Sequence, residues 1–477
     1  MEQTYHGPLT DDNIRKIFRN ANDFIRRELK AGSQTVYFYA IDGITASADA
    51  SDFVVKPLSA ASADSMESLY CRALSGTVYN AVADPCADLD TLALKLVNGF
   101  CVVLFPQVGA VAFEVKTPEK RGLSAPEVEN TVKGPKDAFV ETNRSNTGLV
   151  RRHLRSPDLG IYETQIGRRS LTNVSLIWLE GVANPQLVQR MKRRLEEIDI
   201  DGMVSPSSVE EYVTGSRPTA FPLLQYTQRT DRFCQGILDG RVGLFVDGLP
   251  MGYLAPVNLG TLMTSPEDRG RDYISASCIR VLRYGALLLS LLLSGVYIAM
   301  ATFHQEMIPM PLLRAIIESK QAVPFSTAVE VLGLLIAFEL LQESGIHLPQ
   351  AVGQAVSIIG GIVVGTAAVE AKLISPAALI AVSIAGVCGF VLPNRDLAEA
   401  IRVWRFAIAV LGALGGLFGV TMGAVGLLVH LSDLESMGVA YLAPFSNGTP
   451  PEILRRRLKH SKLRNSLWKP QDRRNQR

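Results

Sequence analysis

The run VLRYGALLLSLLLSGVYIAMATF, residues 281–303, decides the fold class because it is long and apolar enough to cross a lipid bilayer. A bilayer core about 30 Å thick needs about 20 mainly apolar residues in a helix. Three further runs reach or approach that length, at 352–369, 373–392 and 406–431. We therefore predict four membrane spans in the C-terminal part of the chain.

The stretch 325–341 is also apolar, but it carries Glu330 and Glu339. A carboxylate at the bilayer centre costs on the order of 2.5 to 3.5 kcal/mol. Their spacing places the two glutamates on opposite sides of a straight helix, so one water-exposed face cannot accommodate both. The stretch is interpreted as an interfacial or re-entrant helix rather than a full span.

Basic residues near the span ends predict the orientation, because they are retained on the cytoplasmic side. Three arginines precede the first span, Arg271, Arg280 and Arg283, and the tail 446–477 is strongly basic. Both ends of the membrane domain are therefore expected to be cytoplasmic, which requires an even number of spans. Three more arginines conflict with the four-span count, because it places them on the outer side: Arg395, Arg402 and Arg405. Either the count is wrong by one hairpin, or that segment is an amphipathic surface helix.

The residues before the first span have the mixed, charged composition of a soluble region, and the chain as a whole has a net charge of +2. The N-terminal residues MEQTYHGPLTDDNIRK include no apolar signal segment, so we expect this region to stay inside the cell. The six cysteines show no CxxC spacing, which favours reduced thiols over a zinc site or a disulfide framework. The basic tail is interpreted either as a solvated end or as a segment attracted to anionic lipid.

The soluble region alternates predicted strands and helices. TVYFYAIDG (35–43), FCVVLFP (100–106) and VSLIWLE (174–180) read as strands, and NPQLVQRMKRRLEEI (184–198) as a helix capped by Asn184. With IDIDG (198–202) read as extended again, this unit is βαβ-like. A helix after Thr230 and a strand at 242–246 form a second such unit.

These patterns predict an α/β soluble N-terminal region of two subdomains, followed by an α-helical multi-span membrane domain. The expected boundaries are 1–125 and 126–272 for the two subdomains, 273–445 for the membrane domain and 446–477 for a basic cytoplasmic tail.

The sequence contains no phosphate-binding loop, dinucleotide fingerprint, nucleophile elbow or cluster of metal ligands. We therefore predict no enzyme activity, catalytic residue, cofactor or metal. The basic run Arg151, Arg152, His153 and Arg155 is interpreted as a solvated helix face, and no nucleic-acid partner is expected.

Small residues recur at four-residue spacing within two predicted spans. Such spacing lets membrane helices approach closely, either inside one subunit or at a subunit interface or pore. The helix-packing candidates are Gly361, Gly365, Gly415, Gly419 and Gly423.

Several long motifs resemble one family, the A subunits of the GerA-type germinant receptors of bacterial spores. The motifs are VKGPKDAFVETNRSNTGLVRRHLRSPDL (132–159), GRRSLTNVSLIWLEG (167–181), LLQYTQRTDRFCQGILDGRVGLFVDGLP (223–250), TFHQEMIP (302–309), GQAVSIIGGIVVGTAAVEA (353–371) and GVAYLAPF (438–445). The resemblance implies a spore inner-membrane protein that acts with a transporter-like B subunit and a lipoprotein C subunit. It also implies a homo-oligomer that forms a nutrient-gated ion channel and triggers germination.

If that function applies, the glycine-rich segment near 353–365 is the candidate pore, because it combines small residues with almost no charge. A constriction of this kind gates by dewetting. The pore-lining candidates are Ile359, Gly360, Val363 and Val364. A substrate-translocating transporter and a membrane-anchored scaffold are the alternative hypotheses.

Overall fold

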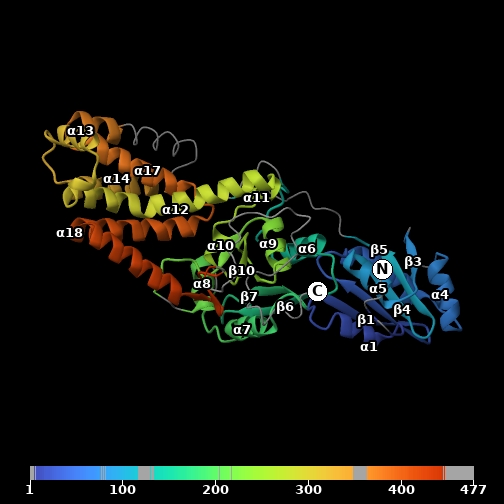
Figure 1. The fold of residues 1–477 in the computed structure, drawn as a ribbon. Coiled ribbons are helices and arrows are strands. Elements are labelled where there is room, and N and C mark those ends of the chain that lie inside the picture. The colour runs from blue at the N-terminus through green and yellow to red at the C-terminus, as the bar shows by residue number, and fades with distance from the viewer. Residues whose placement is uncertain are drawn as a thin grey trace. The chain divides into compact units, whose positions relative to one another are not determined.

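The computed structural model describes residues 5, 7–76, 78, 80, 82–116, 129, 134–202, 205–215, 218–347, 363–443 and 445. These residues fall into two compact units (Figure 1). The first, α/β unit lies within 1–216 and 223–256, and the second, helical unit within 217–222 and 257–460.

The first subdomain of the α/β unit is an antiparallel five-stranded sheet in the order β1-β2-β4-β5-β3. Its strands are β1 (Phe24–Ala31), β2 (Gln34–Ile41), β3 (Ala83–Cys86), β4 (Phe100–Phe105) and β5 (Gly109–Glu114). Its helices are α1 (Asp11–Ile17), α2 (Ser47–Ala50), the π-helix η1 (Ser51–Val55), α3 (Lys56–Ala60), α4 (Met66–Leu74) and α5 (Leu89–Val97).

Both faces of this sheet are buried, which explains why β4 is apolar along its whole length. Successive side chains of a strand point to opposite faces. Val102 and Leu104 therefore pack with α1 and α5, whereas Cys101, Val103 and Phe105 pack with η1, α3 and α4. The result is a sheet between two layers of helices.

The second subdomain has a similar antiparallel sheet in the order β6-β7-β9-β10-β8. The strands are β6 (Leu159–Ile166), β7 (Thr172–Leu179), β8 (Gln225–Thr227), β9 (Val242–Val246) and β10 (Gly252–Ala255). The helices are α6 (Asn143–His153), α7 (Pro185–Glu196), α8 (Pro206–Thr214) and α9 (Thr230–Leu238). Gly243 and Gly252 leave room for the ring of Phe233, which stacks on Phe245 with 4.6 Å between centroids.

The fold class is confirmed, and most predicted elements are present. The strand at Val242–Val246 has the expected bounds, and α7 begins after Asn184, whose side chain accepts from the backbone N–H of Gln186. The βαβ-like interpretation is wrong, because residues 198–202 form no strand and the paired strands of both sheets are antiparallel.

The two subdomains meet through backbone and buried side-chain contacts. The N–H of Asn22 donates to the carbonyl of Ile161 at 2.9 Å, and the N–H of Ile161 donates to the carbonyl of Asn20 at 2.8 Å. Arg151 of α6 forms two 2.8 Å hydrogen bonds with Asp23, and both side chains are 0% exposed. Arg151 is therefore not part of a solvated helix face, as the sequence had suggested, but a buried contact between subdomains.

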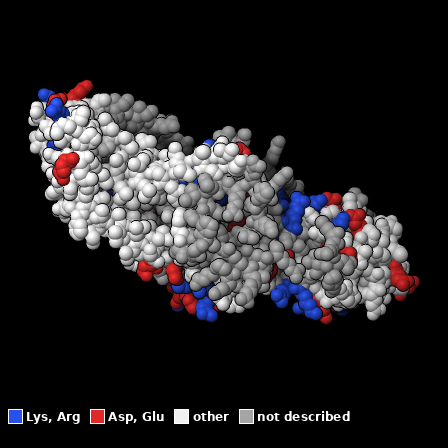
Figure 2. Space-filling view, in the orientation of Figure 1, with Lys and Arg blue, Asp and Glu red and all other residues white. Residues whose placement is uncertain are grey.

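The helical unit begins with α10 (Leu259–Leu262), α11 (Glu267–Gly270) and the long α12 (Tyr273–Thr302). The 3-10 helix η2 (Gln305–Met307), α13 (Met310–Lys320), α14 (Thr327–His347), the π-helix η3 (Val363–Ala367) and α16 (Ala368–Glu370) follow. The last elements are α17 (Pro376–Phe390), α18 (Arg395–Asp433), β11 (Glu435–Ser436) and β12 (Val439–Ala440). Figure 2 shows few charged side chains over α12, α14, α17 and α18 on the face drawn.

Helix α18 is two helices joined at a sharp turn. Gly415 and Gly416 have non-helical backbone angles, and the φ of +59° and ψ of −144° at Gly416 suit glycine alone. The arms 395–414 and 417–433 fold back on each other: a Cβ built at Gly419 would lie 2.0 Å from the carbonyl oxygen of Leu411, and one at Gly423 3.0 Å from Ile408. Figure 1 shows the two arms meeting at this turn.

This hairpin changes the predicted spans. Helices α12 and α18 are long and apolar enough to cross a membrane, and α17 is a shorter apolar helix of 15 residues. The run 406–431, predicted as one span, is divided between the two arms. The first arm of α18 packs along α12 in the same direction, with Gly295 against Ile408 and Phe303 against Gly416. Arg395, at the start of α18, therefore lies at the end of the bundle where α12 begins, and not at the opposite end as the four-span count had placed it.

The stretch with the two glutamates lies in a continuous helix of 21 residues, α14, which packs against α12, α17 and α18. At 1.5 Å per residue its length is about 30 Å. For the predicted span at 352–369, residues 352–362 lie outside the described residues.

Candidate functional site in the helical unit

The residues singled out from the sequence fall into two groups in the structure. Ile359, Gly360 and Gly361 lie outside the described residues. Val363 and Val364 begin the π-helix η3, and a Cβ at Gly365 would lie 3.6 Å from Leu379 of α17.

The other glycines form the inside of the α18 hairpin and its contact with α12. Gly415 is at the turn, whereas Gly419 and Gly423 allow the close approach of the arms. A Cβ at Gly412 would lie 2.8 Å from the carbonyl oxygen of Gly295, so the first arm also packs tightly on α12. Small residues at helix crossings have this effect in membranes.

A cluster of ionised side chains joins α14 to the first arm of α18. Glu339 accepts a 2.7 Å hydrogen bond from Arg405 and a 3.0 Å bond from Arg402. Arg402 also donates to Gln342 at 2.6 Å and lies 3.5 Å from Glu399. Charges inside a membrane domain are expensive unless they are paired or hydrated, so this cluster is a candidate site by its position alone.

A second carboxylate of α14, Glu330, is buried and contacts two other helices. One oxygen accepts from the backbone N–H of Ser375 at 3.1 Å and from its hydroxyl at 2.8 Å, next to the start of α17. The other oxygen lies 3.8 Å from the ammonium of Lys320, the last residue of α13. Glu330 is 0% exposed, so it fastens α13 and α17 to α14.

Two serines of α12, Ser290 and Ser294, are buried, and their hydroxyl groups have no hydrogen-bond partner among the described residues. Buried polar atoms in proteins are almost always bonded to protein or to water.

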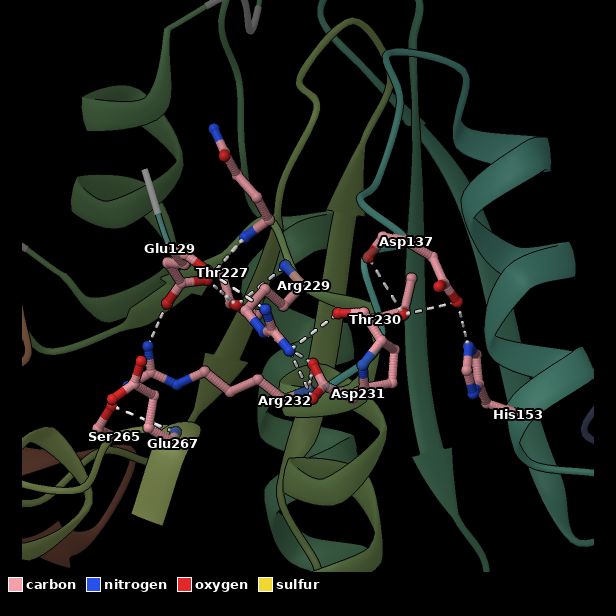
Figure 3. A network of polar contacts seen from close by, with 12 residues as sticks. Glu129, Asp137, His153, Thr227, Arg229, Thr230, Asp231, Arg232, Ser265 and Glu267 are labelled. Carbon is pink, nitrogen blue, oxygen red and sulfur yellow. Dashed lines mark hydrogen bonds and ion pairs between the residues drawn. The ribbon is translucent and has the colours of Figure 1, made fainter. Parts of the chain in front are cut away.

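A separate polar network lies in the second subdomain of the α/β unit (Figure 3). Arg229 donates to Asp231 at 3.0 and 2.9 Å, and Glu129 pairs with Arg232. His153 lies 3.0 Å from Asp137, whose carboxylate also accepts from the Thr230 hydroxyl at 3.4 Å.

This network fastens the segment around Glu129 and Asp137 to α9. In it the Thr230 hydroxyl contacts the carboxylate and not the imidazole, so it does not form a nucleophile and base pair. Among the described residues, no group of three or more His, Cys, Asp or Glu side chains could hold a metal ion.

The junction of the two subdomains contains a cavity of about 350 Å³. Its lining includes Tyr5, Lys16, Asn20, Asp158 and Glu180. Burial and the hydrogen bond to Asp158 raise the pKa of Tyr5, so the phenol stays protonated and donates across the junction at 2.8 Å.

An α/β unit in two subdomains precedes a helical unit that includes two helices long and apolar enough to cross a membrane. A family model described as "Bacillus/Clostridium GerA spore germination protein" matches residues 12–476. The chain belongs to this family of spore germination proteins.

Two Bacillus subtilis proteins are similar along most of their lengths. The chain is 31% identical over 437 residues to the uncharacterized membrane protein YfkQ, covering 91% of this chain and 85% of that protein. It is 30% identical over 449 residues to spore germination protein A1, covering 93% and 92%.

Spore germination protein GerQA of Bacillus cereus is 34% identical over 367 residues, with 76% of this chain and 74% of that protein covered. The crystal structure of the N-terminal domain of the A subunit of the Bacillus megaterium spore germinant receptor GerK3 is 25% identical, with a TM-score of 0.38. It covers 51% of this chain and 91% of that one.

The charges of the bundle are evident in the sequence, but their pairing is not. Glu330 and Glu339 were interpreted as obstacles to a span, and Arg402 and Arg405 as a conflict in orientation. Charge complementarity could have linked these residues. The apolar stretch 325–341 carries the two glutamates, and the two arginines directly precede the apolar run 406–431.

Proposed function

We propose that this chain is the A subunit of a nutrient germinant receptor in the spore inner membrane, and that its oligomer forms an ion channel that nutrients open. The observation that carries the proposal is the extent of the family match. It runs through both the α/β unit and the helical unit. The proposed role is signal transduction by ion release, without a catalytic step.

The proposed partners are a transporter-like B subunit, a lipoprotein C subunit, other copies of this chain and membrane lipid. Lipid or neighbouring copies are needed because the helical unit exposes large apolar side chains, among them Leu288 of α12, Val387 of α17 and Phe418 of α18. Such surfaces are unfavourable in water.

The proposed orientation places the α/β unit and the C-terminal tail in the cytoplasm. Arg280 and Arg283, near the start of α12, pair with Asp268 at 3.1 and 2.8 Å. Arg395 lies at the start of the α18 hairpin, whose arms begin and end at one side of the bundle. Basic residues at one side agree with the rule that they are retained in the cytoplasm.

The proposed pore constriction is the segment with Ile359, Gly360, Val363 and Val364. Val363 and Val364 are the first two residues of the π-helix η3. The π-helix is rare in proteins as a whole, and where it does occur it is frequently at a functional site. An apolar constriction stays closed to ions until it hydrates.

Substitution at the constriction tests this function. We expect Val363→Ser and Val364→Ser to hydrate the constriction and to release potassium from spores in the absence of nutrient. Ile380→Ser, at an exposed position of α17, is the matched control and should leave release dependent on nutrient. Unchanged nutrient dependence in both valine variants would remove these residues from the pore.

A further inference from the structure

Two short stretches of the described chain connect the second sheet of the α/β unit to the helical unit. One, residues 218–224, leads into β8, and the other, residues 256–259, follows β10. Strands β8 and β10 are antiparallel, and Gln225 at the start of β8 is opposite Leu254 near the end of β10. Both connections therefore leave the same end of this strand pair.

Within the α/β unit, Arg241 ties the two connections together. It lies directly before β9, and its Nε donates to the carbonyl oxygen of Pro256 at 2.9 Å. One terminal nitrogen donates to Oε1 of Gln225 at 2.7 Å, and the other has no partner among the described residues. Arg241 is only 5% exposed, and a buried cation is costly unless other groups compensate it. Its two bonds fix the end of β10 to the start of β8.

Within the helical unit, the connection after β10 is bound by the strap, defined as residues 434–443, which follow α18 directly. The hydroxyl of Ser436 accepts from the backbone N–H of Val257 at 2.9 Å. The carbonyl of Tyr441 accepts from the backbone N–H of Leu259 at 2.8 Å. Ser436 and Tyr441 are both 0% exposed, so these bonds are shielded from water.

The connection before β8 contacts the same part of the helical unit. The hydroxyl of Thr219 lies 2.9 Å from Nε2 of His430, in the last turn of α18. The ring of Phe221 packs on that of Tyr441 in the strap, with 5.9 Å between centroids. Both connections are therefore fastened to the end of α18 or to the strap after it.

Neither connection contains enough chain to absorb a displacement. Val257 is the second residue after Ala255, which pairs with Val242 in the sheet. Gln225 of β8 is the fourth residue after Phe221. Even a fully extended chain spans only about 3.3 to 3.6 Å per residue, so the connections reach about 7 Å and about 14 Å. A shift of the strand pair must therefore displace the strap.

From these contacts we infer that Arg241, Ser436 and Thr219 are positioning residues that transmit a conformational change of the α/β unit to α18 through the strap. The inference rests on the proposed channel function, in which a nutrient signal has to reach the membrane helices, and it names residues that carry the signal. When β8 and β10 shift, the end of α18 shifts with them. Without these contacts, the strand pair changes conformation and α18 stays in place.

Hydrogen exchange measured by mass spectrometry tests the link between Arg241 and the strap. The full chain with its receptor partners is studied in detergent. We expect Arg241→Gln to speed amide exchange at least tenfold in peptides covering 257–262 and 434–443, because the connections are no longer tied together. Arg151→Gln is the matched control, since Arg151 is also a buried arginine of the α/β unit but binds Asp23 instead. It should change exchange in these peptides by less than twofold.

Equal acceleration by the two arginine variants would show a general loss of stability in the α/β unit, which would overturn the inference, as would no acceleration by Arg241→Gln. Gln225→Ala, which removes only one of the two bonds of Arg241, repeats the measurement in case Arg241→Gln fails to fold. Either contrary result leaves the channel proposal intact, because hydrogen exchange does not depend on ion release.

The nutrient dependence of potassium release tests the role of the strap. Ser436→Ala leaves the buried N–H of Val257 without its acceptor. We expect the nutrient concentration for half-maximal release to rise at least tenfold, while release at saturating nutrient stays within threefold of the wild type. Ser432→Ala is the matched control, because the Ser432 hydroxyl donates to the Leu428 carbonyl within α18, and it should leave both quantities unchanged.

Thr219→Val, which removes the hydroxyl at the other connection, should shift the nutrient dependence in the same direction and serves as the second variant if Ser436→Ala fails to fold. A merely structural role would lower saturating release in proportion to the amount of chain in the membrane, without changing the half-maximal concentration. That result, or an unchanged response in both variants, would overturn the inference. If the wild-type chain itself supported no nutrient-dependent release, the proposed function would fail instead.

Discussion

At the residue scale, burial decides which ion pairs matter. The Arg151–Asp23 pair is removed from water and joins two subdomains, whereas the Arg168–Asp199 pair, at 2.6 Å, is largely exposed. A buried pair that loses one partner leaves an uncompensated charge, and an exposed pair does not. The shorter distance therefore does not identify the more important pair.

Replacing Arg151 by alanine should destabilise the α/β unit by about 3 to 5 kcal/mol, because Asp23 would remain buried without its partner. Limited proteolysis of the full chain in detergent measures the effect as faster cleavage within residues 1–256. Arg168→Ala is the control and should be cleaved at the wild-type rate. Equal cleavage of both variants would show that the buried pair does not stabilise the junction.

The carboxyl group of Asp11 makes the stability of the α/β unit depend on pH in the acid range. Burial alone would raise the pKa of its carboxyl, but hydrogen bonds from Arg26 and Tyr39 outweigh that effect and hold the pKa below its ordinary value. A lowered folded-state pKa stabilises the protein above the unfolded-state value of about 3.9, and this stabilisation is lost as the pH falls toward the folded-state value.

We therefore expect Asp11→Asn to unfold more easily than the wild type at pH 7, with the difference shrinking between about pH 4 and the lowered pKa. Tryptophan fluorescence during urea unfolding, repeated across pH, measures the difference. A difference that stays constant down to pH 2 would contradict the assignment of the stabilisation to the carboxylate.

At the scale of elements, the sequence predicted helices and strands well where local signals were strong. Helix α7 has Asn184 as its cap and a regular apolar pattern, and it forms close to the predicted bounds. The break in α18 could not be predicted in the same way. Its glycines also suit a straight helix packed against a neighbour. The hairpin is shown by the backbone angles at Gly415 and Gly416 and by the close contacts of Gly419 and Gly423 with the first arm.

Gly419→Ala should separate the arms of α18, because the added Cβ would lie 2.0 Å from the carbonyl oxygen of Leu411. We expect a loss of about 1 to 3 kcal/mol or more from overpacking. The thermal unfolding midpoint of the detergent-solubilised chain measures it. Gly426→Ala, whose Cβ would have no neighbour within 4 Å, should have the wild-type midpoint. Equal midpoints for the two variants would be evidence against the hairpin.

At the scale of the whole molecule, the fold class and the family were accessible from the sequence, but the path of the chain through the membrane was not. Composition separates a charged region from an apolar one, and this contrast does not depend on tertiary contacts. Counting spans does depend on them, because Glu339 is paired with arginines that lie more than 60 residues later in the chain.

Because α18 folds as a hairpin, we expect its two ends to lie on one side of the membrane. Cysteines placed at Pro393 and Asp433, before and at the end of α18, should both be labelled by an impermeant reagent from the side of the α/β unit. Inverted and right-side-out membrane vesicles expose the two sides of the membrane to the reagent in turn. Labelling of the two positions from opposite sides would restore a single straight span.

The proposed function requires that this chain make ion release depend on a nutrient. The most direct measurement is potassium release from spores of the source organism, with and without this chain, on exposure to amino acids, sugars and nucleosides in turn. We expect deletion to abolish release to one nutrient or one group of related nutrients while release to the others continues, and the restored gene to recover the lost response. Unchanged release to every nutrient to which the spores respond would contradict it.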